Sequence, residues 1–263
     1  MITSKTNPQI KAVVRLQKSS ERRKTNRILV EGRREIERAI AYKVNLETLF
    51  YCPDLCPEDP DWPSKNKIAV SKAVFEKIAY RGESDGLLAV AFTPQNSLEK
   101  LQLSNNPLII VLEAVEKPGN LGAILRTADA ARADAILVCD PLTDIFNPNT
   151  IRSSLGCVFS VPVVACSSNE AIQWLKSKKI QIFATYLEAS INYLDANYSK
   201  PAAIVSGTES TGLSQQWINA ANQNLIIPML GIADSLNVSV STAIVVFEAL
   251  RQDAMDRFHN LLS

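Results

Sequence analysis

Apolar residues follow two patterns along the chain, and the change between them lies near residue 93. In the first block, short apolar runs bounded by turn-forming residues predict strands at residues 27–31, 46–52, 67–70 and 87–92. Apolar residues at helical spacing predict a helix that is capped by Asn7 and has Pro8 in its first turn, a second around residues 36–40 and a third over residues 71–80. We therefore expect a small α/β domain over residues 1–93.

The second block alternates apolar strands with helices. Strands are predicted at residues 108–112, 135–139, 161–165, 180–185, 202–205 and 225–227. Helices are predicted at residues 121–131, 150–155, 170–178, 214–221 and 238–258. Such alternation indicates a parallel sheet covered on both faces, with ligands bound outside the carboxyl ends of its strands. The polar residues 94–106 are predicted to be a linker, and residues 107–263 a second domain.

Composition narrows the class of protein. The chain has 263 residues, of which 46% are hydrophobic and 21% charged, values typical of a globular protein. No apolar run is long enough to span a bilayer, and the first residues lack the apolar core of a signal peptide, so we expect a cytoplasmic protein with no membrane partner. The five scattered cysteines favour reduced thiols over a disulfide framework. The single histidine, His259, argues against histidine-based hydrolases and zinc sites, and we expect no metal.

Positive charge is concentrated at the start of the chain. Residues 1–43 contain twelve Lys or Arg and four Asp or Glu, although the net charge of the whole chain is only +1. Such a segment suits a polyanion, because phosphates that are neutralised by protein cations release their counterions. A solvated pair of basic helices would have the same composition, which leaves both interpretations open. The candidate RNA-binding residues are Arg22, Arg23, Lys24, Arg33 and Arg34.

Five of the nine glycines lie in three short loops of the second block, at residues 116–122, 207–212 and 228–239. Each loop follows a predicted strand, where glycine permits close approach of the backbone to a ligand. Each also has a purely structural interpretation: a tight turn for the first, a helix-start acid for the second, and a cap of the last helix by Ser235 or Asn237 for the third. The spacings of the dinucleotide and P-loop motifs are missing.

Together, the three loops resemble the motifs of one family. Residues 120–128, which read NLGAILRTA, resemble the first motif of the SpoU (TrmH-type) RNA methyltransferases of the SPOUT superfamily. Residues 204–214 resemble the second motif, and residues 227–229 with 235–243 resemble the third. The order and spacing of all three agree with the family. The first block is similar to the family's N-terminal RNA-binding domain, a small α/β fold akin to ribosomal proteins.

The resemblance implies a parallel-sheet SPOUT domain with a deep trefoil knot. It implies that the knotted loops bind S-adenosylmethionine, with Gly207, Ile227 and Leu236 at positions that meet the cofactor. It also implies a homodimer whose active site is built near the subunit interface.

The implied reaction is methylation of a ribose 2′-hydroxyl in RNA, and the N-terminal block favours ribosomal RNA of the 23S type. Arg126 matches the arginine that the family uses at the hydroxyl. Because a guanidinium stays protonated, we expect it to hold the target phosphate and to polarise the 2′-oxygen. On its own, Arg126 would be taken for a surface arginine of a helix. The catalytic set that the resemblance implies is Arg126, Asn120, Glu209, Ser235 and Asn237.

Two other functions stay open at this point. One is methylation of transfer RNA, although that branch of the family is often smaller and lacks such a first block. The other is a non-catalytic RNA-binding or ribosome-assembly factor that kept the fold. The intact set of motif residues favours the enzyme.

Overall fold

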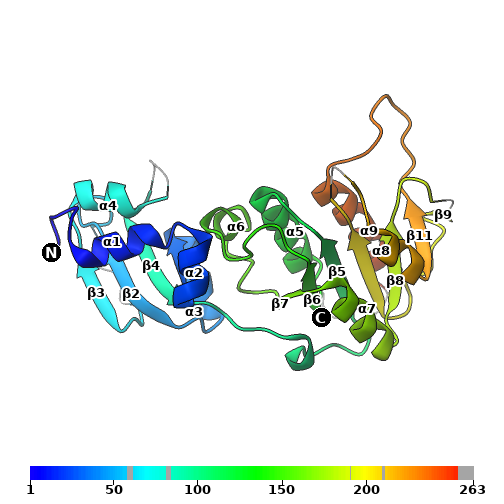
Figure 1. Ribbon diagram of the computed structural model, residues 1–263, viewed down its shortest axis with the longest axis horizontal. Helices are drawn as coiled ribbons and strands as arrows, with labels where there is room; N and C mark the ends of the chain where they lie inside the picture. Colours follow the sequence, from blue (N-terminus) through cyan, green and yellow to red (C-terminus); the bar gives the residue numbers. More distant parts are fainter. Residues whose placement is uncertain (58–61, 81–83, 190, 209–210, 254–263) are drawn as a thin grey trace, which may run out of the picture. The chain divides into compact units, whose positions relative to one another are not determined.

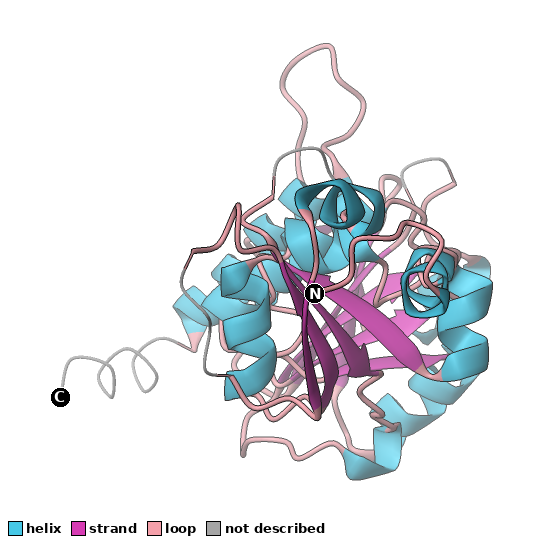
Figure 2. Ribbon diagram, turned by 90° about the vertical axis from the view of Figure 1, so that its left-hand side faces the viewer, coloured by secondary structure: helices cyan, strands magenta, loops and turns pink. Residues whose placement is uncertain are grey.

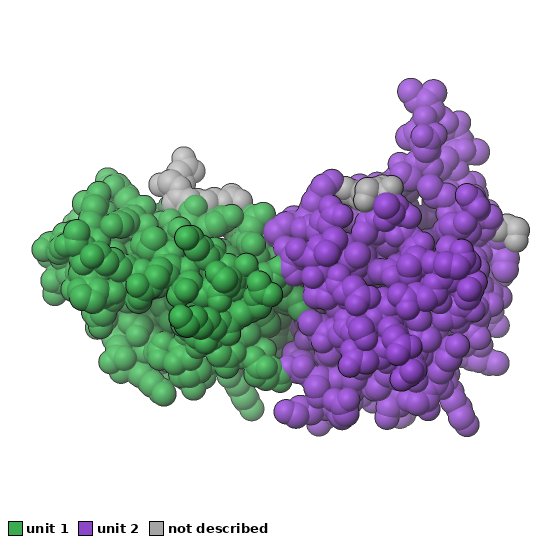
Figure 3. Space-filling model, viewed as in Figure 1, with its two compact units in different colours: residues 1–95, 144–160 green, residues 96–143, 161–263 purple. Residues whose placement is uncertain are grey.

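A computed structural model describes residues 1–57, 62–80, 84–189, 191–208 and 211–253. The chain forms two compact units, the first of residues 1–95 and 144–160 and the second of residues 96–143 and 161–263 (Figure 3). The division near residue 95 lies close to the predicted boundary. The segment 144–160, which the sequence analysis assigns to the second domain, belongs to the first unit, and most of the predicted linker belongs to the second.

The first unit contains a four-stranded sheet of order β1-β4-β2-β3, in which only β2 and β3 are parallel (Figure 1). Its first helix begins as the sequence predicts, because the Asn7 side chain accepts a hydrogen bond from the Gln9 amide and a proline follows Asn7. The apolar face of this helix packs with α4 in a buried core. The elements are α1 Pro8–Arg15, α2 Ser19–Thr25, β1 Arg27–Glu31, α3 Arg33–Ala41, β2 Leu46–Tyr51, β3 Asn66–Ala69, α4 Lys72–Ile78, β4 Leu87–Phe92 and α6 Pro148–Ser153.

The segment 144–160 is held in the first unit by arginine side chains. Arg22, only 3% exposed, forms a salt bridge to Asp144 with an Nη2–Oδ2 distance of 2.6 Å. Arg38 donates from Nη1 to the carbonyl oxygen of Leu155 at 2.6 Å. Helix α6 of this segment packs against β1. A stretch of chain that follows β6 in sequence therefore completes the fold of the first unit.

The second unit contains a seven-stranded, wholly parallel sheet of order β7-β6-β5-β10-β8-β11-β9. After β5 the chain builds one side of the sheet through β6 and β7, and after β7 it crosses to the other side, where it forms β8. Strand order thus reverses beside β5 and β10, the position at which open α/β sheets bind ligands. The elements are η1 Leu98–Lys100, β5 Leu108–Glu113, α5 Pro118–Ala130, β6 Ala135–Cys139, β7 Val163–Cys166, α7 Ser168–Ser177, β8 Gln181–Thr185, β9 Ile191–Asn192, β10 Ala202–Ser206, α8 Gln215–Ala220, β11 Gln223–Ile226 and α9 Val238–Gln252.

Helices cover both faces of this sheet, as the alternation of elements predicts. Figure 2 colours the chain by secondary structure and shows helices on either side of the strands. Ala203 and Val205 of β10 face the core that contains α7 and α8. Ser206, at the end of the same strand, hydrogen bonds with Thr242 of α9 at 2.9 Å between the two hydroxyl oxygens, and both residues are buried. Helix α9 in turn packs against α5 on this face.

The predicted strands and helices all occur, with ends that differ by a few residues. Helix α2, the 3-10 turn η1 and the short strand β9 are absent from the sequence prediction. The last helix, predicted to reach residue 258, ends at Gln252, and residues 254–258 lie outside the described part of the chain. All five thiols are free, and none of the described helices is long and apolar enough to cross a membrane. The trefoil knot stays a prediction.

Candidate active site

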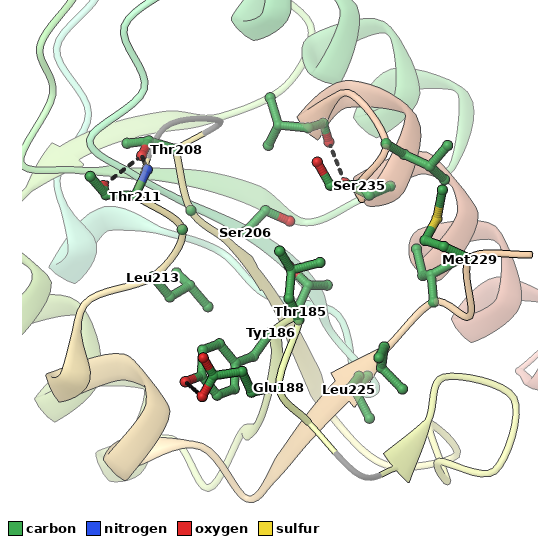
Figure 4. A pocket seen from close by; sticks show the side chains of 18 residues that line it. Thr185, Tyr186, Glu188, Ser206, Thr208, Thr211, Leu213, Leu225, Met229 and Ser235 are labelled. Atoms are coloured by element: carbon green, nitrogen blue, oxygen red, sulfur yellow. Dashed lines mark hydrogen bonds between the residues drawn. The ribbon is translucent and has the colours of Figure 1, made fainter. Parts of the chain in front are cut away.

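A cavity of about 330 Å³ lies where β8, β10 and β11 end at their carboxyl termini (Figure 4). Its walls come from three parts of the chain: residues 185–188, residues 206–208 with 211–213, and members of the segment 225–241. Loops that follow parallel strands meet at one edge of a sheet, which explains why residues so far apart in sequence share this cavity. Three residues assigned to the cofactor by resemblance, Gly207, Ile227 and Leu236, all line it.

The loop after β10 closes on itself. The Thr208 amide donates to the Gly212 carbonyl at 3.2 Å, and the Gly212 amide donates back to the Thr208 carbonyl at 3.1 Å. A Cβ added to Gly207 would collide with the Gly212 carbonyl, and Gly212 itself has a φ of +66°. Both glycines are therefore required by the geometry of this loop. Glu209, between them, lies outside the described residues.

The third loop connects to the first through two asparagines. Asn237 caps α9, because its Oδ1 accepts from the Ser239 amide at 3.0 Å. Its Nδ2 also donates to Oδ1 of Asn120, in the first turn of α5, at 3.3 Å. Capping and a place in the site thus coexist at Asn237. Ser235, two residues earlier, lines the 330 Å³ cavity.

A smaller cavity of about 80 Å³ adjoins the first and shares Gly207, Thr208 and Val238 with it. Its other walls include Asn120 and Glu113. The structure therefore gathers Asn120, Ser235 and Asn237 around two neighbouring cavities, although their positions in the sequence span more than a hundred residues.

Arg126 is not part of either cavity wall. It lies on α5, exposed, two residues before the buried Ala128 and one after the buried Leu125. Of the five residues assigned to catalysis, Ser235 lines the larger cavity, Asn120 lines the smaller one and Asn237 is hydrogen bonded to Asn120, whereas Arg126 is in neither wall. The fifth, Glu209, is outside the described part of the chain.

Sequence reasoning missed the wall that follows β8. Tyr186 and Glu188 line the cavity, and the Tyr186 hydroxyl donates to Glu188 Oε2 at 2.8 Å (Figure 4). This hydrogen bond raises the pKa of the Tyr186 phenol above its ordinary value. Thr185 anchors the strand end by donating from Oγ1 to the Val205 carbonyl at 3.1 Å. The sequence could have indicated these residues only by their place at the end of a predicted strand, because ligands bind at the carboxyl ends of parallel strands.

The basic residues of the first unit fall into distinct groups. Every nitrogen of the Arg22 guanidinium is bonded within the unit, to Asp144 and to the carbonyls of Leu16 and Gln17. Arg22 is therefore withdrawn from the candidate RNA-binding set, because its burial leaves no surface for a phosphate to meet. By contrast, Arg23 and Lys24 are exposed on α2.

The other two candidates have local partners. The Arg33 guanidinium lies 5.6 Å from the ring centroid of Trp62, a distance that suits a cation–π contact. Arg34 donates to Oε1 of the buried Glu35 at 2.9 Å, while its own side chain remains 54% exposed. Arg34 therefore keeps surface that a phosphate could reach.

The 330 Å³ cavity has the size of a small-molecule site, whose usual range is about 300–1,000 Å³. Glycine, threonine and main-chain groups on one side and apolar Leu225, Ile227 and Met229 on the other suit a ligand that combines a polar ribose with apolar surface. These residues fit the cofactor that the resemblance implies.

Comparison with known proteins assigns both parts of the chain. Residues 107–247 match the model of the SpoU rRNA methylase family. Residues 7–89 match an MRM3-like substrate-binding domain. The match over 107–247 covers more than half of the chain and includes all three glycine-bearing loops.

Individual relatives extend over most of the chain. A 23S rRNA (guanosine(2553)-2′-O)-methyltransferase of Bacillus subtilis is 32% identical over 94% of this chain and 97% of its own length. A crystal structure of an AdoMet-bound rRNA methyltransferase from Sinorhizobium meliloti has a TM-score of 0.87, is 30% identical and covers 95% of this chain and 97% of that one. The tRNA (guanosine(18)-2′-O)-methyltransferase of Escherichia coli is 33% identical over 59% of this chain and 67% of its own. The family and α/β class predicted from sequence are confirmed, and the chain belongs to the SpoU rRNA methylase family.

Proposed function

We propose that this protein is an RNA 2′-O-ribose methyltransferase that uses S-adenosylmethionine to methylate a ribose hydroxyl in ribosomal RNA. The observation that carries the proposal is the pair of adjoining cavities at the strand ends. The second and third glycine-bearing loops line the larger one, and the first loop meets them at the smaller one. The AdoMet-bound relative supports the methyl donor. The relative that matches both units along nearly its whole length, an enzyme of 23S ribosomal RNA, supports the substrate class.

The cofactor, when bound, supplies an electrophilic methyl group on a positively charged sulfur. The residues assigned to it are Gly207, Ile227 and Leu236. Gly207 lines the cavity, and because it has no side chain its main chain can lie close to the Gly212 carbonyl, which keeps the loop closed. Ser235 provides a hydroxyl at the same wall.

The substrate side requires a ribose 2′-oxygen in line with the methyl group. We assign Asn120 and Asn237 to orientation of the ribose, because their side chains are bonded to one another beside the smaller cavity. Arg126 would hold the neighbouring phosphate and polarise the 2′-hydroxyl, whose proton would pass to that phosphate when the methyl group is transferred and the C–S bond of the donor breaks to leave a neutral thioether. Glu209 is assigned to the network that holds the arginine or its loop.

The proposal includes a homodimer, which two features of the second unit support. Val240 and Phe247, two turns apart on α9, are 47% and 45% exposed. Leu230 and Ile232 in the loop before α9 are almost completely exposed. Apolar surface of this kind marks a protein interface. Arg126 is exposed on α5, the helix that packs against α9, and we assign it to the active site formed with that second copy. Light scattering of the purified protein measures the predicted dimer mass.

The first unit is assigned to RNA binding. Its match to a substrate-binding domain and its exposed Arg23, Lys24 and Arg34 support this role. A tRNA substrate is the second candidate, but the E. coli tRNA enzyme is similar to much less of this chain than the ribosomal relative is. Ribosomal RNA in the cytoplasm is therefore the proposed target.

Transfer of a labelled methyl group from S-adenosylmethionine tests the proposal. The protein is incubated with 23S-type ribosomal RNA and, in parallel, with bulk transfer RNA, and ribose methylation is mapped in each. We expect label in the 2′-O-methyl group of one ribosomal nucleotide. Label in transfer RNA alone would move the assignment to the second candidate. Binding of RNA without any transfer would leave a non-catalytic assembly factor.

A further inference from the structure

Glu113 is a buried acid at the end of β5 that the assigned machinery does not use. It is 7% exposed, and it is one of the few buried carboxylates of the described chain. Burial of a carboxylate is costly unless hydrogen bonds replace its lost water. The partners of this side chain therefore indicate what it does.

Both oxygens of Glu113 accept from the same residue. Oε2 accepts from the Ser214 amide at 2.7 Å, and Oε1 accepts from the Ser214 hydroxyl at 2.6 Å. The Ser168 hydroxyl lies 3.3 Å from Oε1, and this hydroxyl accepts in turn from Nε1 of the fully buried Trp217 at 2.9 Å. The carboxylate thus ties the start of α8 to the end of β5 by two short hydrogen bonds.

The position of Ser214 connects these hydrogen bonds to the wall of the 330 Å³ cavity. Ser214 directly follows Leu213, and residues 211–213 line the 330 Å³ cavity together with residues 206–208. Glu113 directly precedes the segment that leads to Asn120, and it lines the smaller cavity together with Asn120 and Gly207. One side chain therefore fixes the exit of the cofactor loop to the start of the segment that carries a substrate-orienting residue.

We propose that Glu113 is a positioning residue that holds residues 211–213, and through their hydrogen bonds Thr208, in a ligand-binding conformation and thereby sets the affinity for S-adenosylmethionine. It does not touch the reacting atoms. The inference rests on the proposed function, since it takes the 330 Å³ cavity as the cofactor site. Without the carboxylate, the Ser214 amide and hydroxyl lose their partner, and the exit of the loop is released.

Asp140 provides a matched control. It follows the neighbouring strand β6 and accepts from the Ser168 amide at 3.1 Å and from the Ser168 hydroxyl at 2.6 Å. It therefore anchors the start of α7 as Glu113 anchors the start of α8. Its removal leaves both bonds between Glu113 and Ser214 in place, and its one link to Glu113 is the shared Ser168 hydroxyl, 3.3 Å from Oε1. Asp140→Ala should lower the melting temperature and leave cofactor affinity near that of the wild type.

The test measures binding of S-adenosylmethionine and of its demethylated product by calorimetry, and amide hydrogen exchange of residues 207–213 in the ligand-free protein. Glu113→Ala should weaken binding about ten-fold, the effect of losing a hydrogen bond to a charged group, and should speed exchange in this loop. In steady-state assays, KM for the donor should rise more than kcat falls. Glu113→Gln keeps an oxygen for the Ser214 amide and offers its NH₂ to the hydroxyl, so it should restore most of the affinity.

Ser214→Ala removes one of the two bonds with little change in volume, and it serves where Glu113→Ala fails to fold. It should weaken binding about three-fold. Wild-type affinity in both the alanine variants, or an equal loss of affinity in Asp140→Ala, would overturn the positioning role while the proposed function stands. Absence of binding by the wild-type protein would overturn the proposed function and this inference together.

Discussion

The two units differ in the groups that shape them: arginine side chains in the first, and glycines with main-chain hydrogen bonds in the second. In the first unit, the side chains of Arg22 and Arg38 bind the segment 144–160 to the rest of the unit. In the second, the cavity is shaped by glycines and main-chain hydrogen bonds, and the arginine that matches the family motif, Arg126, is exposed with no part in the cavity wall. A dense run of basic residues therefore does not by itself define an RNA-binding face. Exposure separates the arginines that are free to meet a phosphate from those that stabilise the fold.

Arg126→Ala gives the largest expected effect. We expect methyl transfer to fall by about a hundred-fold or more, because loss of one donor at a developing charge has this size. Affinity for S-adenosylmethionine should stay within about two-fold of the wild type, since Arg126 is absent from the cavity wall. Single-turnover rates and calorimetry measure the two quantities. A wild-type rate would remove Arg126 from the mechanism.

Gly207→Ala should abolish most cofactor binding. The added methyl group would collide with the Gly212 carbonyl, and such overpacking costs about 1–3 kcal/mol when the neighbour is main chain. Gly231→Ala is the control, because a Cβ at Gly231 meets nothing within 4 Å. Calorimetry should show about a ten-fold or greater loss for the first variant and little change for the second. Equal affinities would mean that the loop after β10 adapts freely.

Arg22→Ala and Arg23→Ala should differ in their effect on the free energy of unfolding. Removal of Arg22 leaves Asp144 without its partner, and we expect a loss of about 3 kcal/mol in the free energy of unfolding. Arg23 is exposed, so its removal should change stability by less than about 0.5 kcal/mol. Urea denaturation measures both. Equal stabilities would show that the buried ion pair does not hold segment 144–160.

Charge reversal at Arg23 and Lys24 should weaken RNA binding and lower its dependence on salt, because fewer counterions are released from the RNA. The slope of log affinity against log salt should fall by about one for each phosphate that the protein no longer neutralises. Filter binding at several salt concentrations measures this slope. An unchanged slope would assign these residues to a solvated surface.

The smallest effect is expected at the ion pair between Arg27 and Glu47. A hydrogen bond from Arg27 holds the pKa of Glu47 below its ordinary value. The pair therefore adds stability above the unfolded pKa of about 4.3, and this stability is lost as the pH falls through the lower folded pKa. Because both side chains are partly exposed, we expect about 0.2–1 kcal/mol. Glu47→Gln should flatten the stability profile below about pH 4.3, and an unaltered profile would show that the pair contributes nothing.

Local sequence signals predicted the elements and the motif loops well. Alternating apolar strands indicated the parallel sheet, and Asn7 and Asn237 cap the helices that their positions indicated. Local patterns do not predict which residues far apart in the sequence will contact one another. The ion pair between Arg22 and Asp144 joins residues 122 positions apart, so composition counted Arg22 as a surface cation. Glu113 was missed for the same reason, since its partner Ser214 lies 101 positions away.

The discontinuous make-up of the first unit has a consequence for synthesis of the protein. Its last 17 residues, 144–160, leave the ribosome only after β5 and β6 have been made. An N-terminal domain would otherwise fold as soon as it emerged. In this protein, Arg22 can form its salt bridge to Asp144 only after strands β5 and β6 of the second unit have been synthesised. Maturation of the two units is thereby linked in time, and a truncated N-terminal fragment that ends at residue 95 lacks a piece of its own structure.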